Sequence, residues 1–197
     1  RNANLFSVAV ADLKKTLNIP PENYNLWATI EDLRVFAGTK PKRISLDLEW
    51  DSYGNITLCG LTDRYYTGLV CEWNLDVAKV VREIVEGCEV LVGQNIIGAD
   101  TRWFERLNWT IKAEIIDTML IQHLVQPDMR HNLGFIASVF TNKPFWKGKG
   151  EEAEDEEGNA GGGGGAQWKT WDSPDAIPRS LGGYGGCTNA EEAYRLY

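Results

Sequence analysis

The sequence predicts an α/β fold, in which helices flank a mixed sheet of about five strands with the first three antiparallel. Stretches with strand character follow one another at 43–50, 56–62 and 68–73. The turn-forming segments DSYGN and DRYYT separate them, which indicates an antiparallel meander. Beyond this meander, strand-like and helix-like stretches alternate, which indicates a mixed sheet covered by helices.

The elements after the meander follow from hydrophobic spacing. Apolar residues at helical intervals predict a first helix, with Asn74 as its N-terminal cap. The predicted order is helix 76–87, strand 89–95, helix 98–107, strand 113–117, helix 118–125 and helix 131–141.

Two domain-level segments are predicted on either side of this pattern. Residues 1–40 form an N-terminal helical segment, with helices at 8–17 and 27–37 separated by the turn-forming IPPENYN. Residues 41–197 form the main domain, with a flexible acidic and glycine-rich insertion at 148–166, whose pentaglycine is either native or an engineered splice. The chain begins with Arg and ends inside a helix-like pattern, which predicts a fragment of a longer protein.

The composition is that of a globular domain, with 43% hydrophobic and 24% charged residues. No apolar run reaches the length of a membrane span, so no membrane partner is expected. Four scattered cysteines predict reduced thiols in a cytoplasmic protein rather than a zinc site. The net charge of −8 argues mildly against nucleic-acid binding by bulk electrostatics, but EEAEDEE alone supplies six acidic residues.

Two carboxylates occupy the polar face of the predicted strand ISLDLEW. Asp47 and Glu49 alternate with apolar residues, so they project from the same face, and held that close they repel each other unless a cation neutralises them. Hard divalent cations such as Mg²⁺ or Mn²⁺ take such oxygen ligands. The alternative is an amphipathic strand whose polar face lies in water.

A third carboxylate follows in VGQNIIGADTRWF, where a buried strand passes through a short turn into a helix beginning near Asp100. Open mixed sheets place their sites at the rim where such strand-to-helix junctions lie. The alternative is an acidic residue that is favoured at a helix N-terminus by the macrodipole. Asp117, at the end of another strand, is predicted to cap a helix rather than to bind a metal.

Together these motifs resemble the DEDD (DnaQ-like) 3′–5′ exonucleases, in particular the proofreading domain of polymerase A-type, phage-like DNA polymerases. ISLDLEW is similar to the first family motif and GQNIIGAD to the second. The stretch EIIDTMLIQHLVQPDMRHNLGFIASVFTNKPFW is similar to the helical region that follows, so the resemblance covers about 43–146. It implies an RNase H-like fold.

The resemblance also implies a two-metal hydrolysis of the terminal phosphodiester of single-stranded DNA, with two Mg²⁺ or Mn²⁺ ions. Asp47 would bridge both ions, Glu49 would bind the ion holding the attacking water, and Asp100 would bind the second ion. The family's third motif, Tyr-x-x-x-Asp, does not fit Tyr184. Tyr197 is the best candidate for its tyrosine, orienting the water, with the fourth aspartate either beyond residue 197 or lost.

Substrate and partners are expected on the same basis. Asn95 is predicted to hydrogen-bond substrate or to brace the site, the alternative being a strand-end cap. Trp50 is predicted to stack on unpaired bases, the alternative being packing in the core. The expected partners are a single-stranded DNA 3′ end and a polymerase domain C-terminal to this chain, in the cytoplasm of a bacterial or phage-infected cell.

Three other interpretations remain open from the sequence. An RNA-trimming relative of the RNase D or Werner type would use the same carboxylates. A catalytically inactive exonuclease fold that binds nucleic acid or a partner is favoured by the absence of a visible fourth aspartate. A globular domain whose acidic loop recruits a basic partner rests on EEAEDEE alone.

Overall fold

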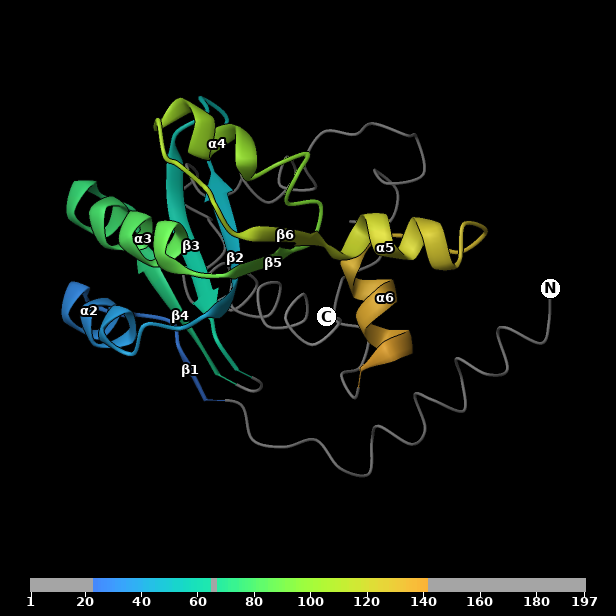
Figure 1. Cartoon of the computed structure of the whole chain (residues 1–197), viewed down its shortest axis with the longest axis horizontal. Helices are drawn as coiled ribbons and strands as arrows, with labels where there is room; N and C mark the ends of the chain where they lie inside the picture. The colour runs from blue at the N-terminus through green and yellow to red at the C-terminus, as the bar shows by residue number, and fades with distance from the viewer. Residues whose placement is uncertain (1–22, 65–66, 142–197) are drawn as a thin grey trace, which may run out of the picture.

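The computed structural model describes residues 23–64 and 67–141 of the chain. The predicted helix at 8–17, the insertion at 148–166 and Tyr197 lie outside the described residues. Within the described part, one sheet runs through the centre and helices lie around it (Figure 1).

The sheet has six strands in the order β1-β4-β3-β2-β5-β6. The central strand β2 pairs antiparallel with β3, β3 pairs antiparallel with β4, and β2, β5 and β6 run parallel to one another. This arrangement confirms the predicted α/β fold, a mixed sheet flanked by helices in which an antiparallel meander is joined to parallel strands. The strands are β1 (Asn23–Asn25), β2 (Arg43–Trp50), β3 (Ile56–Thr62), β4 (Thr67–Glu72), β5 (Val90–Gly93) and β6 (Glu114–Asp117).

The first strand, β1, was not predicted, because the sequence indicates a turn at IPPENYN. Its three residues pair in parallel with β4, Asn23 opposite Thr67. The polar sequence of β1 has no apolar alternation, so pairing and packing in the folded protein, not local propensity, make it a strand. Tyr24, at its centre, packs over buried Leu58 and Val70.

Five helices are described, and their starts are marked by side-chain caps or polar residues. Thr29 and Asp32 form a reciprocal capping box at the first of them, and Asn74 caps the second as predicted, accepting from two backbone N–H groups. None of the described helices is long and apolar enough to span a membrane. The helices are α2 (Ile30–Gly38), α3 (Leu75–Gly87), α4 (Thr101–Arg106), α5 (Thr118–Val125) and α6 (Leu133–Phe140).

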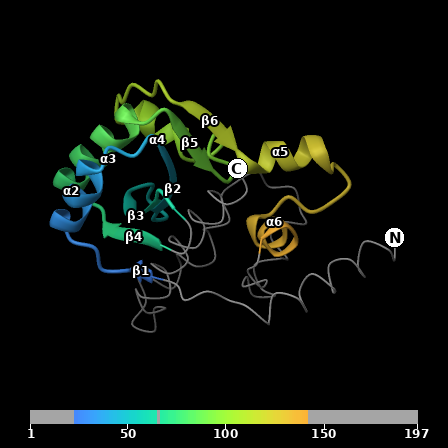
Figure 2. The same cartoon turned by 60° about the horizontal axis from the view of Figure 1, so that its bottom comes forward.

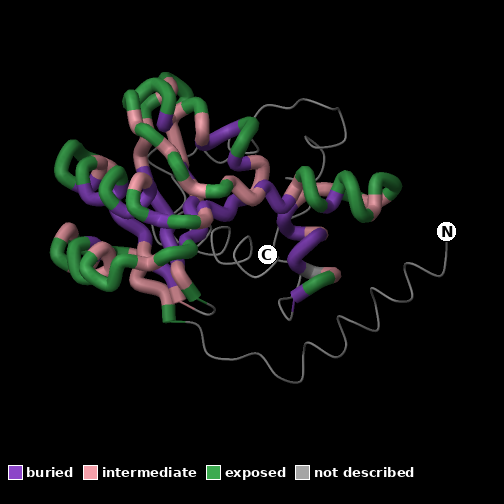
Figure 3. The backbone as a smooth tube through the Cα atoms, in the orientation of Figure 1, coloured by how far each residue is buried: buried purple, intermediate pink, exposed green. Residues whose placement is uncertain are grey.

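The main core lies between the sheet and helices α2 and α3, which stack together beside it, while α5 and α6 lie beyond the end of β6 (Figures 1 and 2). Figure 3 shows burial concentrated in the strands, with further buried residues in α3 and α6. Ile44, Leu46 and Leu48 of β2 belong to this core together with Leu33 of α2 and Val81 of α3. Because strand side chains alternate, the opposite face of β2 carries its polar residues.

Candidate metal and nuclease site

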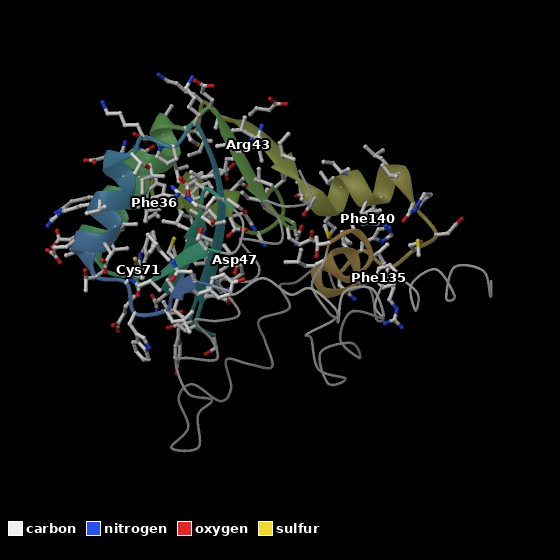
Figure 4. The ribbon with its side chains drawn as sticks, turned by 90° about the horizontal axis from the view of Figure 1, so that it is seen from below. Phe36, Arg43, Asp47, Cys71, Phe135 and Phe140 are labelled. Atoms are coloured by element: carbon white, nitrogen blue, oxygen red, sulfur yellow. The ribbon has the colours of Figure 1, made fainter. Side chains whose placement is uncertain are left out.

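The central strand β2 places Asp47 and Glu49 on the face opposite the α2–α3 core. Both side chains are half-buried, and they alternate with the core residues Leu46 and Leu48. Figure 4 labels Asp47 on the sheet, away from Phe36 of α2. The residue paired with Asp47 on β3 is Gly60, which has no side chain to cover the carboxylate from the neighbouring strand.

A register shift between Glu49 and Trp50 ends the regular pairing of β2 with β3. Up to Glu49 the strands pair residue for residue, with Glu49 opposite Leu58, but Trp50 pairs with Ile56. Irregularities of this kind bend a strand and redirect its side chains, and they are frequent next to active sites. Here the shift lies between Glu49, on the polar face of β2, and Trp50, the residue that follows it.

Asp100 lies 52 residues after Leu48 in the chain and contacts the same strand, β2. It occupies the residue before α4, as predicted, but its side chain does not cap that helix. Instead its Oδ1 accepts a hydrogen bond of 3.0 Å from the backbone N–H of Leu48, the residue between Asp47 and Glu49. Asp100 is only 3% exposed. The structure therefore brings its carboxylate against the predicted metal strand, which a simple helix-terminal charge would not require.

The surroundings of Asp100 raise the pKa of its carboxyl group well above its ordinary value. Burial is the largest cause, because it removes water from the charged form, and the negative charge of Asp47 is the second. The N–H of Leu48 acts in the opposite direction, and Asp117 contributes further repulsion. Asp47 and Asp100 thus form a carboxylate pair that a bound cation would relieve.

The connection from β5 to Asp100 is fixed by Asp117, the last residue of β6. Its carboxylate caps α5 as predicted, accepting from the N–H groups of Met119 at 3.0 Å and Leu120 at 3.4 Å. The same carboxylate also accepts from the N–H of Asn95 at 3.0 Å and of Ile97 at 3.2 Å. Sequence reasoning found the cap but missed the two bonds to the connection.

Asn95 is part of the turn that leads to Asp100. Its backbone lies in the left-handed region with a φ of 55°, and its carbonyl accepts a hydrogen bond of 2.9 Å from the N–H of Ala99. Asparagine tolerates this backbone conformation better than most residues. These contacts belong to the Asn95 backbone, so a role of its side chain in bracing the site or in contacting substrate stays a prediction.

Trp50 is half-buried and packs against the main core. Its ring lies 5.7 Å from that of Trp103 in a tilted arrangement, and the guanidinium of Arg106 lies over Trp103 at 4.8 Å. These contacts fit the core-packing interpretation, and the stacking of a base on Trp50 stays a prediction.

The donor set suits a hard divalent cation in its chemistry but does not form a complete metal centre. Within residues 23–64 and 67–141, no three His, Cys, Asp or Glu side chains are grouped closely enough to hold an ion. The two-carboxylate pair of Asp47 and Asp100 nevertheless matches what Mg²⁺ commonly takes from a protein, since water and substrate phosphates supply its remaining ligands. Glu49 lies on the same face of β2 as a further oxygen donor.

Comparison with known proteins finds likenesses among solved structures. No family model matches the chain, and no curated protein matches it. Among solved structures, the chain is similar to the exonuclease domain of EXD2, determined from a crystal soaked in Mn. The identity is 11%, the match covers 88% of this chain and 86% of that one, and the TM-score is 0.33, so this likeness carries no argument about activity.

Proposed function

We propose that this chain is a metal-dependent nuclease, a 3′–5′ exonuclease that hydrolyses the terminal phosphodiester of single-stranded DNA. The observation that carries this proposal is the buried carboxylate of Asp100, held by the N–H of Leu48 on a strand that presents Asp47 and Glu49. Buried carboxylates that repel each other are costly to the fold and are therefore characteristic of sites that act on a ligand.

In this proposal Asp47 and Asp100 hold a divalent cation, with Glu49 as a further donor. A bound Mg²⁺ or Mn²⁺ would lower the pKa of its water and stabilise negative charge on the phosphate oxygens. The chain itself supplies orientation, because the Leu48 N–H fixes one oxygen of Asp100 and the pairing of β2 with β3 fixes the backbone of Asp47. Glu49 would bind the ion that holds the attacking water.

The substrate and context are proposed from the motif resemblance described above. A single-stranded 3′ end would enter over the polar face of β2, and Asn95 and Trp50 would lie at its border. The expected setting is proofreading for a polymerase domain C-terminal to this chain, in the cytoplasm of a bacterial or phage-infected cell. Tyr197 would orient the water, with the fourth aspartate following it.

The test is digestion of single-stranded DNA with Mn²⁺, using one substrate labelled at the 3′ end and one at the 5′ end. A 3′–5′ exonuclease releases the 3′ label at once as a mononucleotide and shortens the 5′-labelled strand progressively. Loss of an outer-shell partner of a metal costs up to about 100-fold in activity. Because Asp47 is proposed to bind the metal directly, Asp47→Ala should reduce the rate by at least about 100-fold. Glu83→Ala, an exposed acidic residue on α3, is the control and should cut normally.

The same assay addresses the alternatives. An RNA strand of identical sequence cleaved faster than the DNA would favour the RNase D-like interpretation. The inactive binding module is favoured by one observation, namely that no three metal-ligating side chains group together in the described part of the chain. The chain should also be compared with one extended by about ten residues to include the expected fourth aspartate. If both proteins bind the strand and neither cleaves it, the nuclease proposal is overturned and the inactive binding module is supported.

A further inference from the structure

We propose that Asp117 is a positioning residue for Asp100: it fixes the connection between β5 and α4 so that the Asp100 carboxylate stays against β2. This inference rests on the proposed function, because it assigns Asp117 a role in holding the metal pair Asp47 and Asp100 without touching the metal itself. Asp117 is only 4% exposed, so its contacts are shielded from water.

The two carboxylate oxygens of Asp117 bond to different segments of the chain. Oδ1 accepts from Asn95 and from Met119 and Leu120 at the start of α5, whereas Oδ2 accepts from Ile97. A helix cap needs only the bonds to α5. The bonds to Asn95 and Ile97 satisfy backbone donors in a segment that belongs to neither a strand nor a helix, and no capping function requires them.

Hydrogen bonds continue from Asn95 and Ile97 along the connection to Asp100. The carbonyl of Ile97 accepts a hydrogen bond of 2.7 Å from the hydroxyl of Thr101, and the carbonyl of Ile96 accepts one of 3.0 Å from its N–H. Ile96 is fully buried in the main core. A displacement at Asn95 or Ile97 is therefore transmitted to Asp100, which lies between these bonded residues.

Thr118, the residue after Asp117, holds the start of the same connection. The hydroxyl of Thr118 bonds to the carbonyl of Gly93 at 3.3 Å and to the side-chain carbonyl of Gln94. The amide nitrogen of Gln94 donates to the carbonyl of His131 at 2.7 Å. Asp117 and Thr118, which are adjacent at the β6–α5 junction, thus bond to residues from the end of β5 to Ile97, which is the arrangement expected of an outer shell around a site.

The test is Asp117→Asn in the full chain, with the Mn²⁺ dissociation constant measured directly from the electron paramagnetic resonance of free Mn²⁺. An amide has one acceptor oxygen, so the variant keeps either the Oδ1 bonds or the bond to Ile97, but not both. The Mn²⁺ dissociation constant should rise by about 10- to 100-fold. Cleavage should recover at saturating Mn²⁺, because Asp47, Glu49 and Asp100 are all intact.

Asn74→Ala is the matched control, since Asn74 caps α3 through two backbone N–H groups and lies away from the site. It should lower the melting temperature and leave the Mn²⁺ dissociation constant unchanged. An unchanged dissociation constant in Asp117→Asn, with tight Mn²⁺ binding by the parent chain, would overturn the role of Asp117 alone. Tight Mn²⁺ binding without cleavage, by the parent and by the chain extended to include the expected fourth aspartate, would overturn the nuclease and leave the Asp117 result valid. No Mn²⁺ binding would overturn both.

Discussion

At the scale of single residues, the buried carboxyl group of Asp100 destabilises the fold when it is ionised, and the same group is proposed to bind the metal. Its carboxyl group is buried beside Asp47, and its pKa is raised from an ordinary value of 3.8. Between the ordinary and the raised pKa, the folded protein binds more protons than the unfolded chain. The free energy of unfolding therefore falls as the pH rises through this interval, since ionisation of Asp100 is easier in the unfolded state.

Removal of this ionisable group should change how stability depends on pH. Asp100→Asn removes the ionisation while its side-chain oxygen can still accept the bond from Leu48, so the variant should gain stability relative to the parent as the pH rises from about 4, near the ordinary carboxyl pKa, to 8. Urea unfolding in the presence of a chelator at several pH values measures the difference. Parallel pH profiles for the two proteins would contradict the assignment of the buried charge.

The site residues also show what a sequence can and cannot predict. Asp47, Glu49 and Asp100 follow from their spacing and motifs, and the cap at Asp117 follows from its place between strand and helix. The bonds from Asp117 to Asn95 and Ile97 join residues 22 and 20 positions apart. No local pattern encodes such pairings, because they exist only once two parallel strands lie side by side.

At the scale of elements, the connection between β5 and α4 is tightly packed. A Cβ atom on Gly93 would lie 2.7 Å from the Cβ of Ile96 and 2.9 Å from its Cδ1. Ile96 is fully buried and its Cβ cannot move away without its backbone. Glycine at this position is therefore needed for the close approach of the chain to itself rather than for an unusual backbone angle.

Gly93→Ala is accordingly expected to reduce the free energy of unfolding by about 1–3 kcal/mol, the typical cost of overpacking. Gly87→Ala is the control, because a Cβ at Gly87 would have no neighbour within 4 Å and the residue ends α3. That variant should gain about 0.4–1 kcal/mol through the lower entropy of its unfolded chain. Denaturant unfolding of both proteins measures the contrast, and equal effects would contradict the packing argument.

Element boundaries were predictable where the local pattern is strong. Strands β2 and β3 and helix α5 occupy the residues that the sequence predicts. Helix α4 is shorter than predicted, spanning Thr101–Arg106, because the preceding residues form the turn at Asn95 that Asp117 holds. Strand β1 could not be predicted, since only its pairing with β4 defines it.

At the scale of the whole molecule, the core on the α2–α3 side supports the strand that carries the site. Leu46 is 1% exposed and immediately precedes Asp47. Leu46→Ala should therefore reduce the free energy of unfolding by about 2–5 kcal/mol. Leu124→Ala makes the same chemical change at a side chain that is 84% exposed, and it should alter stability by no more than about 0.5 kcal/mol. Thermal unfolding of the two variants distinguishes these outcomes.

The two edges of the sheet have a consequence for how the protein behaves among its own copies. In the described residues the outermost strands are β1, with three residues, and β6, with four. At about 3.3 Å per residue, each offers a foreign strand only about 10–13 Å of backbone to pair with. Short edges of this kind discourage intermolecular strand addition, a common route to aggregation. The longer strands β2 and β3 lie inside the sheet: β3 pairs with β2 and β4, and β2 pairs with β3 and, over Arg43–Ser45, with β5. The described part of the folded chain should therefore resist fibril formation in concentrated solution.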